Sequence, residues 1–246
     1  MLRHALGPLR DIHTAGIINA RILAAIAMNS HQPSLSSRAK WNQRHQQREL
    51  PVAACRVLQN HRDLLPCTGL ALDVACGLGG NAVLLAQAGL ECEAVDISDV
   101  AVTRLNDYAR SQNLSLTARQ ADIETNGLGL VSNLVAKQYD VITVSYFLYR
   151  PLFPALIAAL KPGGLLFYQT FVSTAAGEMR GPKNSNFYLH KKELLSHFKG
   201  LEIRYYCEGP HDRNDNAAAE AELIARKPSS WNSSDGSLCS DTRSSN

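Results

Sequence analysis

Acidic side chains lie within or at the end of three short apolar runs in the first half of the chain, and a glycine-rich turn follows the first of these runs. Asp73 lies inside the first run, and Gly77 and Gly79 come directly after it. Asp96 closes the second run and Asp122 the third. In a parallel sheet, a bare backbone turn and carboxylates placed in this way surround one crevice, where the sugar of an adenosine-type cofactor can lie.

The position of Asp73 indicates which kind of cofactor this is. Residues 77–82 read Gly-Leu-Gly-Gly-Asn-Ala, which fits the loose G-x-G-x-x-G/A pattern of nicotinamide and flavin sites. A pyrophosphate needs a free helix N-terminus, and a carboxylate four residues before Gly77 works against that anion. Such a carboxylate suits a cofactor with a positive amino group or a sulfonium. A cationic adenosine cofactor is therefore favoured, and a nicotinamide oxidoreductase is the alternative.

The elements that position these residues alternate along the chain. The apolar patterns predict strands at 70–75, 92–95, 116–120, 139–144, 165–171, 201–207 and 219–225, and helices at 50–62, 80–88, 100–110, 154–160 and 191–198. Strand-helix alternation predicts a doubly wound, mostly parallel α/β sheet with helices on both faces. The last two strands have no helix between them, so the last strand must be antiparallel. We therefore expect a seven-stranded Rossmann-like fold.

Length and composition set the limits of this domain. The chain has 246 residues and a net charge of +3, which is too small to indicate a nucleic-acid partner. We expect a folded domain at 40–226, an N-terminal extension at 1–39 that is disordered or a targeting signal, and a disordered tail at 227–246. Six scattered cysteines form no metal or disulfide pattern, so we expect no metal and a cytoplasmic protein, or an organelle protein if the extension is a transit peptide.

Several of these motifs together resemble the class I S-adenosylmethionine-dependent methyltransferases. The resemblance rests on the run from 71 to 81, Asp96, Asp122, the strand at 139–142 and the Lys-Pro-Gly-Gly segment at 161–164. The antiparallel last strand is also their topology. The family commonly has glycine where Ala75 stands. Alanine fits there where φ is negative, and we interpret Ala75 as a minor variant.

Within this class the chain is similar to the small tellurite-resistance (TehB-like) methyltransferases. Residues 41–45 look like their opening segment, in which a basic residue, here Arg44, reaches over the cofactor. The segment 79–81 looks like their Gly-Arg-Asn turn, with glycine in place of arginine. His211 and Arg213 lie near the place where relatives carry a His-Arg pair, and we interpret them as the catalytic candidates.

The resemblance implies roles for the remaining site residues. Asp73 and the turn glycines would hold the methionine end, Asp96 the ribose, and Asp122 the adenine amine. Side chains at the ends of the first four strands would complete the cofactor site. The full set is Arg44, Asp73, Ala75, Gly77, Gly79, Asn81, Asp96, Ile97, Asp122, Ile123, Ser145 and Tyr146.

The same residues predict methyl transfer by in-line displacement to a small-molecule acceptor, such as a thiol or a metalloid oxyanion. Arg150, Arg180 and Arg213 could bind an anionic acceptor. The segment after the fourth strand lacks the N/D-P-P-Y/F/W motif of base methyltransferases, which disfavours nucleic acid. A protein or RNA methyltransferase and a catalytically inert partner subunit are the alternatives. We expect a monomer or homodimer without membrane contact.

Overall fold

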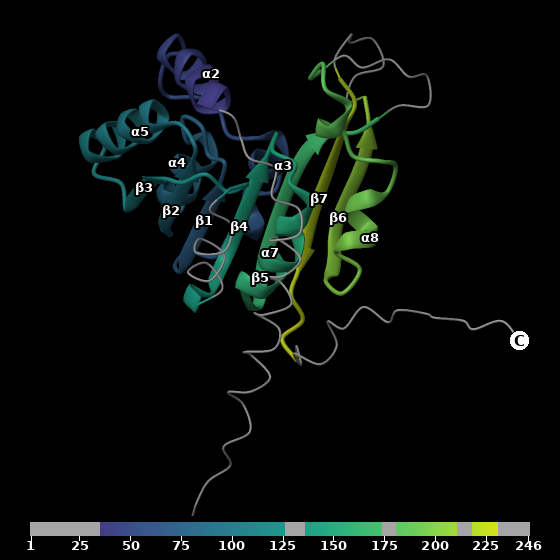
Figure 1. Ribbon diagram of the computed structural model, residues 1–246. Helices are drawn as coiled ribbons and strands as arrows, with labels where there is room; N and C mark the ends of the chain where they lie inside the picture. The colour runs from purple at the N-terminus through teal and green to yellow at the C-terminus, as the bar shows by residue number, and fades with distance from the viewer. Residues whose placement is uncertain (1–34, 126–135, 174–180, 211–217, 231–246) are drawn as a thin grey trace, which may run out of the picture.

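The computed structural model describes residues 35–125, 136–173, 181–210 and 218–230, and these form a single seven-stranded sheet. Its strand order is β3-β2-β1-β4-β5-β7-β6, as Figure 1 shows. The strands are β1 (Leu70–Val74), β2 (Glu91–Asp96), β3 (Leu116–Gln120), β4 (Tyr139–Ser145), β5 (Leu160–Phe171), β6 (Glu202–Gly209) and β7 (Glu220–Arg226).

The pairing confirms the expected topology. The pairs among strands β1 to β5 are all parallel, whereas β7 runs antiparallel to both β5 and β6. The helices are α2 (Leu35–Gln46), α3 (Arg56–Asn60), α4 (Gly80–Gln87), α5 (Asp99–Ser111), α7 (Phe153–Ala159) and α8 (Glu193–His197), with 3-10 turns η1 (Arg62–Leu64), η2 (Arg150–Leu152) and η3 (Ser185–Phe187).

Alternation along each buried strand builds two cores, one on each face of the sheet. Leu72 packs with α7 and α8, whereas its neighbour Ala71 packs with α3, α4 and α5. In Figure 1, α7 and α8 lie in front of the sheet and α4 behind it. Because both faces are covered, the central strands β1 and β4 are mostly apolar, and this pattern made them recognisable in the sequence.

The first helices differ from the expectation. Only residues 56–60 of the expected helix at 50–62 are α-helical, because the Cys55 amide bonds to the Asn81 side chain at 2.8 Å instead of entering a helical turn. Pro51 also disfavours helix in the residue before it. An additional helix, α2, begins at Leu35, inside the expected extension, and lies beside α5 (Figure 1).

The other end of the domain also extends beyond the expected boundary. Lys227 is buried, and its ammonium group donates to the carbonyls of Ile157 and Leu160 at 3.0 and 2.6 Å. Its main chain pairs with Gly163 and Gly164, so the segment expected to stop α7 is already part of β5. Among the described residues, none of the helices is long and apolar enough to cross a membrane.

Candidate cofactor site

The turn after β1 is built from left-handed residues. Gly77 has φ +53° and Gly79 has φ +77°, a region that glycine enters without steric cost. Ala75 has φ +54°, so the expectation of a negative φ at this position is wrong. For a residue with a Cβ this conformation costs about 1–2 kcal/mol. Backbone strain of this kind is concentrated at functional sites, so Ala75 marks the turn as one.

Close neighbours explain why Gly77 and Gly80 carry no side chain. A Cβ on Gly77 would lie 3.1 Å from Cε1 of His45. A Cβ on Gly80 would lie 2.3 Å from the Ala53 carbonyl oxygen, which is too close for any side chain. Glycine in place of the arginine of the similar family is therefore a consequence of how the chain before α3 packs on α4.

Asp73 lies beneath the turn and is fully buried. Its carboxylate accepts hydrogen bonds from the Thr143 hydroxyl at 2.9 Å, the Ala82 amide at 3.1 Å and the Asn81 amide group at 3.3 Å. Burial raises the pKa of Asp73 to about 7, against the opposing effect of these donors. The side chain supports the start of α4 from below, and it faces other residues of the chain.

Asp96 connects the turn to the end of β2. Its Oδ2 accepts from the Gly77 amide at 2.7 Å, and its Oδ1 accepts from the Ser98 amide at 2.8 Å. Burial raises the pKa of this carboxyl group, and the two amides and His45 oppose that shift. Each carboxylate oxygen keeps a second lone pair, so Asp96 can still accept hydrogen bonds from a ligand hydroxyl.

Helix α2 covers this part of the site and is tied to the start of α5. Arg38 and Asn42 both donate to the Asp99 carboxylate, at 3.0 and 2.8 Å. The Ser98 hydroxyl donates to the Asn42 carbonyl oxygen at 2.7 Å and also caps α5. These contacts hold α2 directly over the loop that follows Asp96.

The residue that α2 places on the turn is His45, which sequence reasoning missed. Its side chain is buried beside Gly77, and its Nδ1 has no partner among the described residues. Burial lowers its pKa, and the charge of Asp96 opposes this shift. Arg44, expected to reach over the cofactor, is exposed and lies 4.9 Å from the centre of the Trp41 ring. The structure therefore places the expected basic residue away from the turn.

The remaining expected residues lie at the ends of β3 and β4. Asp122 uses both oxygens to close its own turn, accepting from the Glu124 and Thr125 amides and the Thr125 hydroxyl, and Ile123 beside it is buried. The Ser145 hydroxyl accepts from Asn81 at 2.9 Å, and Tyr146 follows it with φ +53°. Ile97, between Asp96 and Ser98, is half-buried.

Three expectations concern cations near an acceptor. His211 and Arg213 lie outside the described residues, as does Arg180. Arg150 is engaged within the protein, since its guanidinium forms two hydrogen bonds with Glu193, at 2.5 and 2.9 Å. The expectation that Arg150 is available to an anionic acceptor is therefore wrong in this structure.

These residues fit an adenosine cofactor that carries a positive charge. The turn presents bare backbone, Asp96 retains acceptor capacity for hydroxyls, and His45 has a buried nitrogen that a bound group can satisfy. Because Asp73 lies below the turn, the site has a carboxylate where a pyrophosphate would need positive potential.

Comparisons with known proteins agree with this geometry. Residues 71–164 match the family model described as a methyltransferase domain. The chain is 28% identical to hemagglutinin 1 of Eikenella corrodens over 171 residues, 67% of this chain and 53% of that protein. It is 29% identical to the ubiquinone biosynthesis O-methyltransferase of Methylococcus capsulatus over 105 residues, 41% of this chain and 42% of that protein. The chain thus spans about half the length of the curated relatives it matches.

Among solved structures, TehB from Haemophilus influenzae superposes with a TM-score of 0.57 at 22% identity, covering 70% of this chain and 61% of that one. At this identity the likeness concerns the fold. Residues 71–164 are therefore similar to a methyltransferase domain, and the whole seven-stranded sheet has the fold of the class I S-adenosylmethionine-dependent methyltransferases.

Proposed function

We propose that this protein transfers a methyl group from S-adenosylmethionine to a small-molecule acceptor. The observation that carries the proposal is the hydrogen bond between the Gly77 amide and Asp96, inside a domain that matches methyltransferases. It fixes the glycine turn beside a carboxylate that can still accept hydrogen bonds, at the carboxyl ends of the first two strands, and α2 lies over both.

Each part of the site has a role in this proposal. Asp96 would bind the two ribose hydroxyls, and Ile97 and Ile123 would pack on the adenine, with Asp122 at its edge. Gly77 and Gly79 would receive the methionine end. Asp73 would act on that end through Asn81, which also contacts Ser145.

The chemistry then requires little from the protein beyond placement. The sulfonium of the cofactor, when bound, supplies an electrophilic methyl carbon. The turn, Asp96 and α2 would fix its position and exclude water, and orientation of this kind can lower a barrier by about 7–11 kcal/mol. An acceptor that is already anionic needs no general base. For one that must lose a proton, His211 stays the candidate base, as predicted from the sequence.

A small acceptor is supported by the segment after β4. It reads Ser-Tyr-Phe-Leu-Tyr at 145–149 and has none of the prolines that base methyltransferases use there. The relative named as a ubiquinone biosynthesis O-methyltransferase also supports a small acceptor, methylated on oxygen. Methylation of a protein or an RNA is the second candidate, and an inert cofactor-binding subunit the third.

A labelling experiment separates these candidates. The purified chain is incubated with methyl-labelled S-adenosylmethionine and a cell extract, and the products are divided by size and by protease and RNase treatment. We expect label in the small-molecule fraction, and none with the Asp96→Ala variant. Label that disappears with protease or RNase would favour the second candidate. Cofactor binding without any transfer would favour the third.

A further inference from the structure

Three aromatic rings lie in contact at the carboxyl ends of β4 and β5. Tyr146 follows β4, Phe171 ends β5 and Tyr188 follows η3. The ring centres of Tyr146 and Phe171 are 5.3 Å apart, and those of Phe171 and Tyr188 are 5.9 Å apart. These separations are typical of interacting aromatic pairs. We call Tyr146, Phe171 and Tyr188 the aromatic row.

The exposed end of the aromatic row is held in a strained conformation. Tyr146 has φ +53°, yet it remains 48% exposed, so burial does not explain the strain. Its amide donates to the Gln169 carbonyl at 2.8 Å, and its hydroxyl accepts from the Gln169 side chain at 2.9 Å. A strained backbone that displays a large ring at the site edge is typical of a residue with a binding role.

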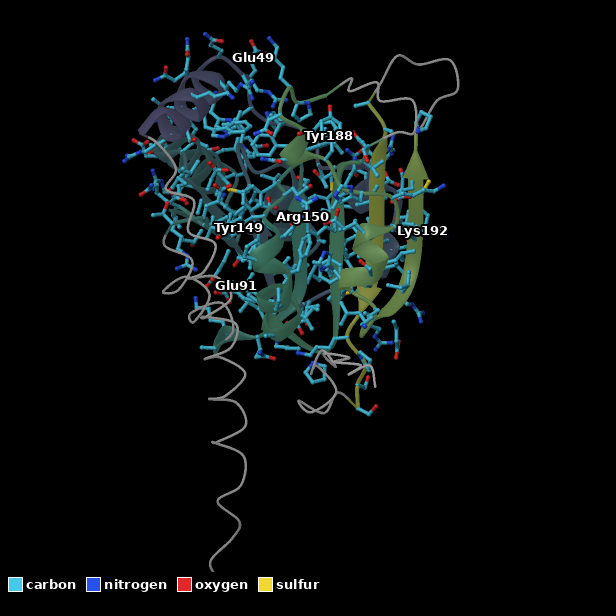
Figure 2. All side chains as sticks on the ribbon, turned by 45° about the vertical axis from the view of Figure 1, so that its right-hand side comes forward. Glu49, Glu91, Tyr149, Arg150, Tyr188 and Lys192 are labelled. Carbon is cyan, nitrogen blue, oxygen red and sulfur yellow. The ribbon has the colours of Figure 1, made fainter. Side chains whose placement is uncertain are left out.

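The other end of the aromatic row is fixed from behind. Arg150, whose charge is neutralised by Glu193, donates to the Tyr188 carbonyl at 3.0 Å, and Figure 2 shows it below Tyr188. The Gly181 amide donates to the Tyr188 hydroxyl at 2.8 Å. A Cβ on Gly181 would lie 2.9 Å from that hydroxyl and 3.0 Å from the Phe171 ring. The chain at Gly181 therefore packs directly on the rings.

Charged groups beside the aromatic row are already paired within the protein. Glu220 accepts from the Gln169 side chain at 2.7 Å and from Arg56 at 3.3 Å. Burial and the nearby Glu220 carboxylate raise the pKa of Tyr146, so its hydroxyl is neutral near pH 7. Tyr146 therefore presents an exposed ring and a neutral hydroxyl, beside a carboxylate and an amide that are already hydrogen-bonded.

We propose that the methyl acceptor is a planar, uncharged aromatic molecule that stacks on Tyr146 and Phe171. The inference rests on the proposed function and specifies its acceptor. For a ring hydroxyl, the carbon–oxygen bond forms as the carbon–sulfur bond of the cofactor breaks. The hydroxyl proton leaves to water, and the cofactor departs as neutral S-adenosylhomocysteine. A ring held against two aromatic faces would be oriented for this attack by shape, without an ion pair.

The test compares planar probes with saturated probes of the same hydroxyl pattern. The affinity of the full chain for S-adenosylhomocysteine is measured first by calorimetry. The saturated complex is then titrated with catechol, with cyclohexane-1,2-diol and with tellurite. We expect catechol to bind at least tenfold more tightly than the diol, and tellurite not to compete with it.

Variants assign that preference to the aromatic row. Phe171→Leu keeps most of the volume without the ring, and we expect it to weaken catechol binding at least fivefold. Phe171→Tyr retains the ring and should retain the affinity. Phe187→Leu is the matched control, because Phe187 is an exposed ring outside the row and one residue from Tyr188.

Two results would overturn the inference, and they differ from failure of the proposed function. Equal binding of catechol and the diol would remove the aromatic preference. A Phe171→Leu effect no larger than that of Phe187→Leu would remove the row as its cause. Both are judged in protein that binds S-adenosylhomocysteine normally, whereas loss of that binding in the unaltered chain would contradict the proposed function itself.

Discussion

The Gly77 amide donates to Asp96 Oδ2 at 2.7 Å, and this bond joins the glycine turn after β1 to the end of β2. It means that the two parts of the site are built as one unit. A change in the turn therefore alters the position of the carboxylate as well.

Replacing Gly77 by alanine should damage stability and cofactor affinity together. The left-handed φ costs about 1–2 kcal/mol with a Cβ, and the new methyl would lie 3.1 Å from the His45 ring. Denaturant unfolding and calorimetry with S-adenosylhomocysteine measure the two effects. Gly163→Ala is the control, because it has φ +82° but ordinary contact distances. It should lose stability alone. Equal affinity losses in both variants would contradict the prediction.

Replacing Ala75 by glycine should stabilise the protein. Relief of the strained φ should raise the free energy of unfolding by about 1–2 kcal/mol. The greater conformational freedom of glycine in the unfolded chain lowers it by about 0.4–1 kcal/mol. The net gain of up to about 1.6 kcal/mol corresponds to a rise in melting temperature of up to about 6 °C for a chain of this size. Ala86→Gly in α4, which has no such strain, should lower the melting temperature. A lower melting temperature for Ala75→Gly would show that the strain is absent.

Replacing His45 by phenylalanine should raise the stability of the protein and lower its affinity for the cofactor. Phenylalanine at this position removes the buried Nδ1 that has no described partner, so unfolding should become harder by about 1 kcal/mol. Loss of one hydrogen bond to the cofactor should weaken binding of S-adenosylhomocysteine about 3- to 10-fold. Arg44→Met, on the exposed side of α2, should leave affinity unchanged. The reverse ranking of the two variants would restore Arg44 as the cofactor contact.

Asp73 should give the protein a pH-dependent stability. Its pKa is raised to about 7 in the folded protein, above its ordinary value of 3.8, so the folded state binds the proton more tightly than the unfolded state. Stability from this group is therefore lost as pH rises from about 4 to about 7. Asp73→Asn removes that loss. The melting temperature of the variant should rise relative to that of the unaltered protein between pH 5 and pH 8. A difference in melting temperature that does not change with pH would contradict the raised pKa.

The central strands could be predicted closely from the sequence. β3 occupies 116–120 as expected, and the antiparallel β7 follows from the missing crossover helix. Helix α2 could not be predicted, because its sequence has no apolar stripe and its contacts are with Asp99, far along the chain. The same long-range contacts place His45 rather than Arg44 on the turn. The strain at Ala75 arises from the turn that residues 75–79 form together, which propensity does not reveal.

Calorimetric titration with S-adenosylhomocysteine is the decisive test of the cofactor site. We expect saturable binding of S-adenosylhomocysteine, no binding of NAD(H), and at least a tenfold loss of affinity in Asp96→Ala. Binding of NAD(H) with no binding of S-adenosylhomocysteine would show that the site does not hold S-adenosylmethionine.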